Sequence, residues 1–209
     1  MARDPRYDIL FEPVQLGPVT ARNRFFQVPH CNGMGHRDPT AHAVMRGVKA
    51  EGGWAVVCTE EVEIHPTSDV GGFVEGRLWD EADIPAHERL VEQVHAHGSL
   101  AGIELVHGGM VSANLYGRIP ALGPSNLPVT GYEPMQARAM SREDIGDLRR
   151  RHRQAVERSL RAGRRPAPAT ATPGWPGTGR RCTPGRRRRP VPAGPLPGRR
   201  PDRRRTRPG

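Results

Sequence analysis

The sequence predicts an α/β protein with a parallel sheet, and two observations lead to this prediction. Three apolar runs typical of buried strands alternate along residues 24–163 with three segments that carry helix-capping signals and helical apolar spacing. Strand–helix units in a row are typical of a parallel sheet covered by helices. The pattern stops at Gly163, so we expect a partial domain over residues 1–163 and a separate tail over residues 164–209.

The three expected strands are short and apolar. Residues 24–28 form a run that ends before Pro29, and residues 54–58 are continuously apolar, as in a strand buried on both faces. Residues 99–105 form the third run. The pattern therefore predicts about three neighbouring strands.

The three expected helices are recognised by their ends. Residues 38–52 open with Asp-Pro and close with Gly, residues 83–98 open with Asp-Ile-Pro and close with Gly, and residues 141–163 open with Ser-Arg-Glu-Asp. Aspartate or serine at the cap, proline in the first turn and glycine after the last turn are the usual helix boundaries. Each helix would follow one strand.

Reactive side chains follow each strand, and this favours a (βα)8 barrel over a doubly wound sheet. A barrel gathers its chemistry at the carboxyl ends of its strands. A doubly wound dinucleotide fold would carry G-x-G-x-x-G in its first turn, which this sequence lacks. The residues past the strand ends are His30 and Cys31, then Thr59, Glu60 and Glu61, then Glu104 and His107.

The net charge of +10 belongs to the tail and not to the predicted domain. Residues 164–209 hold 14 Arg and one acidic residue, Asp202, whereas residues 1–163 hold 18 basic and 21 acidic residues. Of the 46 tail residues, 36 are Arg, Pro, Gly or Ala, so the tail cannot bury a core and we expect it to be disordered. We also expect no fourth strand after Gly163, because prolines crowd that segment.

The tail composition supports the hypothesis of a shifted reading frame. The main codon families of Arg, Pro, Gly and Ala begin with two G or C bases, and a GC-rich gene read in the wrong frame yields such a composition. Two rival interpretations remain, an authentic Arg-rich tail that binds nucleic acid and a Pro-rich linker. The first predicts steeply salt-dependent binding, but a single aromatic residue, Trp175, offers no stacking platform.

Nothing in the sequence indicates secretion, a membrane or a metal. The charged start lacks the apolar region of a signal peptide, and no run reaches the length of a membrane span. Cys31, Cys58 and Cys182 have neither metal-ligand spacing nor a disulfide pattern. We expect a cytoplasmic protein.

Several separated motifs resemble the old yellow enzyme family of FMN barrels. Its opening is matched by Leu-Phe-Glu-Pro and Ala-Arg-Asn-Arg-Phe in residues 10–25. The segment Gln-Val-Pro-His-Cys-Asn-Gly at residues 27–33 resembles the trimethylamine and dimethylamine dehydrogenase branch, with its N-methyl amino-acid demethylases. Further matches follow at residues 49–54, 78–80, 95–98, 101–104 and 123–125. The resemblance covers residues 1–163, about three of eight βα units.

The resemblance implies an FMN site. It places Pro29, His30 and Cys31 against the isoalloxazine ring, Glu60 at its border and Glu104 at its pyrimidine edge. In the dehydrogenases a cysteine at the position of Cys31 is bonded to flavin C6. An ordinary buried or hydrogen-bonded role remains the alternative for each of these residues.

The resemblance also implies a reaction, the transfer of a hydride equivalent from an amine C–H bond to the flavin, followed by hydrolysis of the iminium. Glu61 and His107 would border the substrate. In the trimethylamine dehydrogenases of this branch, an aromatic residue at the position of Glu61 helps to cage a methylated ammonium; a carboxylate attracts a cation by charge instead. A small secondary amine or an N-methyl amino acid is therefore favoured over trimethylamine.

Much of the family's machinery has no counterpart here. The arginines that hold the FMN phosphate, a tyrosine/histidine pair and the cysteines of a 4Fe-4S cluster would follow Gly163, and the tail has none in matching order. We therefore expect an inactive chain. An NAD(P)H-dependent ene-reductase is the alternative within the family; the electron acceptor stays open, and the full-length form could be a homo-oligomer.

Overall fold

The computed structural model describes residues 4–70, 74–112, 114–128, 136–163 and 170–173. Its centre is a parallel sheet with the strand order β3-β4-β6-β9, and the short β5 also pairs with β4. β4 and β6 are its long members, with eight residues each. The bounds are β3 Phe26–Gln27, β4 Val56–Glu63, β5 Gly76–Arg77, β6 Leu100–His107 and β9 Thr170–Pro173.

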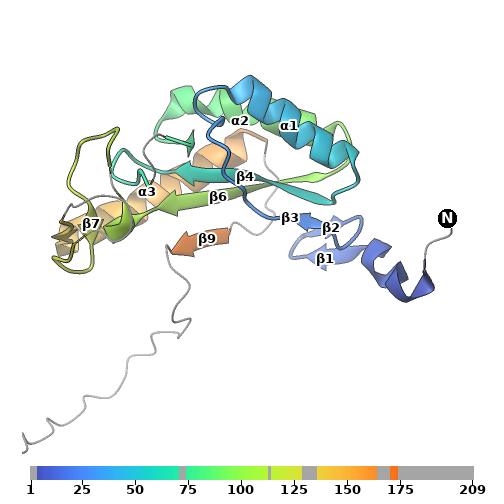
Figure 1. Ribbon diagram of the computed structural model, residues 1–209, viewed down its shortest axis with the longest axis horizontal. Helices are drawn as coiled ribbons and strands as arrows, with labels where there is room; N and C mark the ends of the chain where they lie inside the picture. Colours follow the sequence, from blue (N-terminus) through green and yellow to red (C-terminus); the bar gives the residue numbers. More distant parts are fainter. Residues whose placement is uncertain (1–3, 71–73, 113, 129–135, 164–169, 174–209) are drawn as a thin grey trace, which may run out of the picture. The chain divides into compact units, whose positions relative to one another are not determined.

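Three helices follow β3, β4 and β6 in turn: α1 Pro39–Glu51, α2 Ile84–His95 and α3 Arg142–Arg161. Figure 1 shows α1 and α2 side by side over the sheet, and the two helices pack against each other. The expected order of strand and helix is thus confirmed for all three units. Each strand begins or ends a few residues from its predicted limits, and β4 runs five residues further than the apolar run indicates.

Smaller elements surround the sheet. An N-terminal turn of 3-10 helix precedes an antiparallel hairpin, and two short parallel strands lie in the long segment before α3. The sequence analysis did not predict them. Their bounds are η1 Pro5–Phe11, β1 Val14–Leu16, β2 Val19–Ala21, η2 Glu81–Asp83, η3 Gly109–Val111, β7 Leu122–Gly123 and β8 Arg138–Ala139.

Helix starts show how the local sequence sets the fold. The Asp38 side chain accepts a hydrogen bond from the Ala41 N–H at 3.0 Å, with Pro39 in the first turn. Ser141 and Asp144 form a reciprocal capping box at the start of α3. Asp83 is the N-cap residue of α2, as the sequence indicates, but its side chain makes no capping bond; its carboxylate accepts from the Trp79 N–H at 2.9 Å instead. All three predicted residues therefore stand at the N-cap, and two of them cap the helix through their side chains.

The core lies between the sheet and the helices. One cluster joins Val57 of β4 and Ala101 of β6 to α1 and α2, and another joins Val62 and Leu105 to Ala155 of α3. On the other face, Val56 and Cys58 pack against Ala21 of the hairpin. Side chains of β4 and β6 therefore alternate between a helix-covered face and an opposite face.

The expectation that no strand follows Gly163 is wrong for one short segment. Thr170–Pro173 forms β9, parallel to β6, with Glu104 opposite Thr170 and His107 opposite Pro173. Threonine favours strands, and Pro173 stands last in a strand at the edge of the described sheet, where a missing N–H is tolerated. The shifted-frame hypothesis therefore depends on composition alone. Residues 174–209, with most of the predicted disorder, lie outside the described residues.

No helix among the described residues has the length and apolarity needed to cross a membrane.

Candidate functional site

The candidate site lies at the carboxyl ends of β3, β4 and β6, and it is shaped by a bulge in β4. Cys58 pairs with Gly102 and Glu61 with Glu104, so two residues of β4 stand opposite one residue of β6. The Thr59 hydroxyl accepts the Glu104 N–H at 3.2 Å and fills the interruption. A bulge of this kind changes the direction in which successive side chains point.

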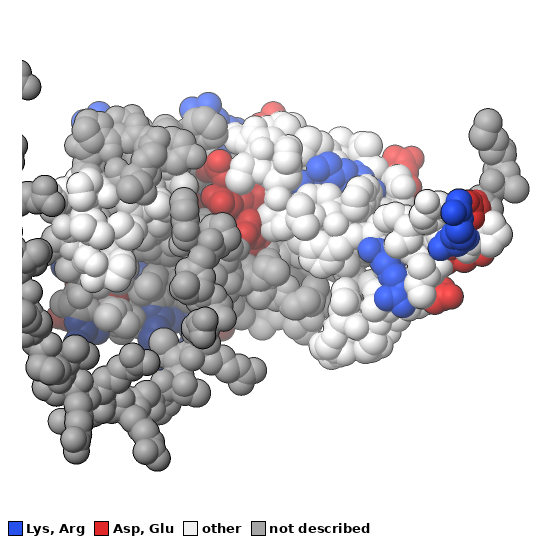
Figure 2. All heavy atoms as spheres, turned by 60° about the horizontal axis from the view of Figure 1, so that its bottom comes forward, with Lys and Arg blue, Asp and Glu red and all other residues white. Residues whose placement is uncertain are grey.

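Cys31, Glu61 and Glu75 meet beyond this bulge. Their sulfur and carboxylate oxygens all lie within 4.8 Å of one another. Glu104 is the partner of Glu61 on the next strand and adds its charge to the same group. On the face that Figure 2 presents, several acidic side chains lie together near the middle of the view, and others are scattered toward its edges. The structure therefore brings together three residues that the sequence analysis had named and one that it had not.

Crowding of carboxylates changes the acidity of this group. Burial, followed by the charges of Glu75, Glu104 and Glu60, raises the pKa of Glu61 to about 7. Burial, the hydrogen bond to Glu75 and the charges of Glu75 and Glu61 raise the pKa of the Cys31 thiol well above its usual range. At neutral pH the site thus holds a neutral thiol beside a carboxyl that is about half ionised, and a cation would be stabilised there.

Glu60 is the site residue that lies deepest, beneath the loop that follows Cys31. Its side chain is fully buried, and its two oxygens accept backbone N–H groups of the loop that follows Cys31. These bonds occupy the carboxylate, so Glu60 lies beneath the loop and not on the open side of the site. The contact of Glu60 with a flavin stays a prediction that this placement does not support.

Pro29 and His30 precede Cys31 on the extension of β3. Pro29 is half-buried and His30 is exposed, and the His30 N–H bonds the Thr59 carbonyl at 3.4 Å. Pro29 and His30 are therefore close to the acidic group because they directly precede Cys31 in the sequence. Their contact with a flavin stays a prediction.

His107 lies apart from the acidic group. It is three residues beyond Glu104 on β6, on the face toward α3, and only 8% of it is exposed. Its Nε2 is 3.0 Å from the Thr67 hydroxyl, and its Nδ1 accepts the Gly109 N–H at 3.1 Å. Burial and nearby His152, His65 and Arg151 lower its pKa to about 4, so it is neutral. Its substrate contact stays a prediction that this placement does not support.

Glu75 is the site residue that sequence reasoning missed. It lies in the long connection between β4 and α2, just before β5, where neither periodicity nor a motif marks it. The Cys31 thiol bonds its side chain, while its Oε2 atom is buried and has no hydrogen-bond partner among the described residues. A buried acceptor of this kind is available to a hydrogen-bond donor of a ligand.

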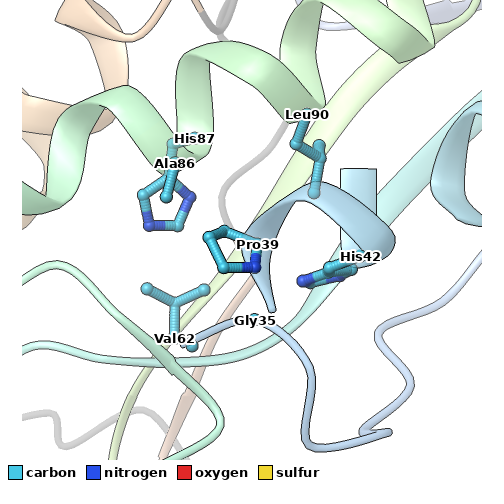
Figure 3. Close-up of a pocket in the computed structure, with 8 residues that line it drawn as sticks. Gly35, Pro39, His42, Val62, Ala86, His87 and Leu90 are labelled. Atoms are coloured by element: carbon cyan, nitrogen blue, oxygen red, sulfur yellow. The ribbon is translucent and has the colours of Figure 1, made fainter. Parts of the chain in front are cut away.

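A cavity elsewhere does not compete with this edge as a ligand site. It lies between the start of α1 and α2, lined by Pro39, His42, Val62 and His87, and Figure 3 shows these side chains around it. Its volume of about 10 Å³ leaves room for about one water molecule. The acidic edge is the candidate because it brings a thiol and carboxylates together.

Residues 9–164 match the NADH:flavin oxidoreductase / NADH oxidase family. The chain belongs to this family of FMN-dependent oxidoreductases, and the resemblance stated from the motifs is confirmed.

Particular relatives are similar over the same part. The chain is 45% identical over 165 residues to dimethylamine dehydrogenase of Hyphomicrobium sp. (strain x), covering 78% of this chain and 22% of that protein. It is 51% identical to the structure of histamine dehydrogenase from Rhizobium sp. 4-9, with a TM-score of 0.74, covering 78% of this chain and 25% of that one. NADPH dehydrogenase of Listeria monocytogenes is 32% identical over 163 residues, 74% of this chain and 45% of that protein. The chain thus spans less than half the length of each of these relatives.

Proposed function

We propose that residues 1–163 are the N-terminal part of an FMN-dependent (βα)8 barrel that oxidises small secondary or tertiary amines or N-methyl amino acids. The acidic group around Cys31 is the observation that carries the proposal, because it combines a thiol with carboxylates that favour a cation. The similarity to an enzyme named dimethylamine dehydrogenase supports it.

The described residues fit the ring of FMN. The ring carries an N–H group that needs an acceptor, and both the half-buried Glu104 and the unpaired Oε2 of Glu75 lie at this edge. Pro29, His30 and Cys31 would hold the ring at the end of β3. When bound, FMN would accept the hydride equivalent from the amine. The protein residues would orient the two reactants.

Glu61 would hold the substrate through charge. Its pKa of about 7 means that it ionises as the pH rises through neutrality, and a protonated amine beside it would favour the ionised form. A carboxylate makes no cation–π contact, so it gives no special preference for a quaternary or fully methylated ammonium. We therefore favour secondary amines and N-methyl amino acids over trimethylamine.

For the polypeptide of 209 residues we propose weak or absent FMN binding and no turnover. The phosphate of a barrel cofactor is normally held by the last two βα loops, and the described part contains four strands of the main sheet path. Adding FMN, desalting and recording the visible spectrum tests this. Retained flavin absorbance would contradict it, and absorbance that survives acid precipitation would indicate a bond to Cys31.

The nucleotides after codon 163 test the shifted-frame hypothesis, which fails if no alternative frame encodes a hydrophobic strand.

A chimera tests the enzyme function. Residues 1–163 would replace the matching segment of the Hyphomicrobium dimethylamine dehydrogenase, with the parent enzyme as control. We expect bound flavin that is bleached anaerobically by dimethylamine or N-methylglycine. In the Glu61→Gln chimera we expect KM for the amine to rise at least about tenfold, because a charged hydrogen bond is lost. A chimera that binds flavin but is bleached by neither amine would contradict the proposal.

The same chimera distinguishes the second candidate, an NAD(P)H-dependent ene-reductase. The similarity to NADPH dehydrogenase favours this candidate. It predicts bleaching by NADPH alone and reoxidation by an unsaturated ketone. The acidic group argues against it, since carboxylates repel the negatively charged phosphates of NADPH.

A further inference from the structure

The loop after Cys31 is held by a carboxylate from the neighbouring strand. One Glu60 oxygen accepts the Asn32 and Gly33 N–H groups at 2.9 and 3.1 Å, and the other accepts the Gly35 N–H at 2.5 Å. Three N–H groups of one turn therefore converge on a single side chain. Such convergence is how loops bind anions, and here the anion site is filled by the protein's own residue.

Glycine is required at two positions of this loop. Gly33 has a φ of +72°, a conformation that L side chains rarely adopt. A Cβ at Gly35 would overlap the Glu60 carboxylate and lie 3.0 Å from the Glu75 carbonyl oxygen. The loop is thus built to bring its backbone against Glu60.

A second anchor, Arg46 of α1, holds the other end of the segment. Arg46 is fully buried, and its Nη2 donates to the His30 carbonyl at 2.5 Å. Its Nε donates to His42 Nε2 at 2.9 Å, and His42 Nδ1 lies 3.8 Å from Glu60 Oε1. Cys31 is therefore the residue between a carbonyl fixed by Arg46 and an N–H fixed by Glu60.

We propose that Glu60 is a positioning residue that, together with Arg46, fixes the turn 30–35 and thereby sets the Cys31 sulfur between Glu61 and Glu75. The bulge makes this possible, because it sends Glu60 under the loop while the next residue, Glu61, borders the thiol. This inference concerns the reactivity of Cys31 and does not depend on the proposed amine oxidation.

Fixing the turn suppresses the thiolate of Cys31. The sulfur faces Glu61 on β4 and Glu75 before β5, whose charges raise its pKa, while a hydrogen bond with the Glu61 backbone and the charge of Arg46 on α1 act in the opposite direction. Cys31 is nonetheless exposed, so a reagent can reach it. Releasing the turn would separate the sulfur from the carboxylates and return its pKa toward that of a free thiol.

Glu60→Gln in the whole chain tests the proposal. A glutamine amide must face at least one of the three N–H groups with its own NH2, so the turn loses a bond. The probe is iodoacetamide, and the rates are read for the Cys31 and Cys58 peptides by mass spectrometry between pH 7 and pH 10. Buried Cys58 reports unfolding of the sheet. We expect Cys31 alkylation at pH 8 to rise at least about tenfold relative to Cys58, with its pH profile moving to lower pH.

Two further variants make the outcome decisive. Glu88→Gln removes an exposed carboxyl from α2 that does not bond the loop, and we expect no change in the ratio of Cys31 to Cys58 rates. Arg46→Lys loosens the turn from its other end and should reproduce the effect of Glu60→Gln. An unchanged ratio in Glu60→Gln would overturn the proposal. So would an equal rise of both rates in Glu60→Gln and Arg46→Lys, which would show loss of the whole fold and not of the turn.

Discussion

Replacing Glu63 by glutamine should make the protein more stable at high pH. Only 2% of Glu63 is exposed, and its Oε2 atom has no hydrogen-bond partner among the described residues. Burial, followed by the charges of Asp69 and Glu75, raises its pKa to about 9. The folded protein therefore keeps a proton that the unfolded chain has lost, and stability falls as pH rises from the ordinary glutamate pKa toward 9.

The size of the effect follows from this difference in pKa. Each pH unit between the two pKa values costs about 1.4 kcal/mol of unfolding free energy. Between pH 4.5 and pH 8 the raised pKa of Glu63 therefore costs at most about 5 kcal/mol. Local relaxation and entering water reduce such penalties, and we expect Glu63→Gln to gain about 1–3 kcal/mol at pH 8 and almost nothing at pH 4.5. Urea unfolding followed by circular dichroism at 222 nm measures both values.

A surface variant serves as the control for this measurement. Glu88 is exposed on α2, and Glu88→Gln should change stability by less than about 0.5 kcal/mol at either pH. If wild type and Glu63→Gln lose stability in parallel between pH 5 and pH 8, Glu63 is not the group that titrates and the reasoning is refuted.

Three further predictions use the same unfolding assay. Gly102→Ala should cost about 1–3 kcal/mol, because its Cβ would lie 2.5 Å from the Cys58 sulfur; Cys58→Ala in the same chain should recover part of this cost, and simple additivity would contradict the contact. His107→Asn should flatten the loss of stability between pH 6.5 and pH 4, since the folded state keeps His107 neutral with a pKa of about 4 while the unfolded chain takes up the proton; an unchanged acid limb would exclude His107 as its source. Asp38→Ala should cost about 1 kcal/mol through loss of the α1 cap, whereas Asp38→Ser should restore most of it.

The sequence predicted the main elements because their signals are local. Asp38 and Ser141 start helices through bonds within their own first turns, and the apolar run at Val57 needs only a buried place in a sheet. The third helix shows the limit of periodicity. Ile145, Ala155, Val156 and Leu160 all follow helical apolar spacing, yet only Ala155 is buried and the three larger side chains stay exposed. Small residues permit close packing, and the pattern of large ones could not indicate that.

The site was predicted less completely than the fold. Cys31 follows β3, and Glu61 and Glu104 lie in the second halves of β4 and β6; parallel strands bring such positions together. Glu75 and the burial of Glu60 could not be predicted, because both depend on a bulge and on a loop conformation that no short sequence pattern encodes. His107 lies three residues beyond Glu104 on β6, which carries it to the opposite face of the strand, and its substrate contact stays a prediction.

Because of the single extra residue in β4, substitutions at positions 60 and 61 have different consequences. Position 60 can change only together with the loop geometry, because its side chain closes three backbone bonds and abuts Gly35. The Glu61 side chain does not hold the loop backbone in this way in the described structure, and it lies beside the Cys31 thiol. A lineage could therefore try new side chains at position 61, and with them new substrates, while the turn that carries Cys31 keeps its shape. Without the extra residue, one side chain would have to both hold the turn and border the thiol, and neither role could then change without the other.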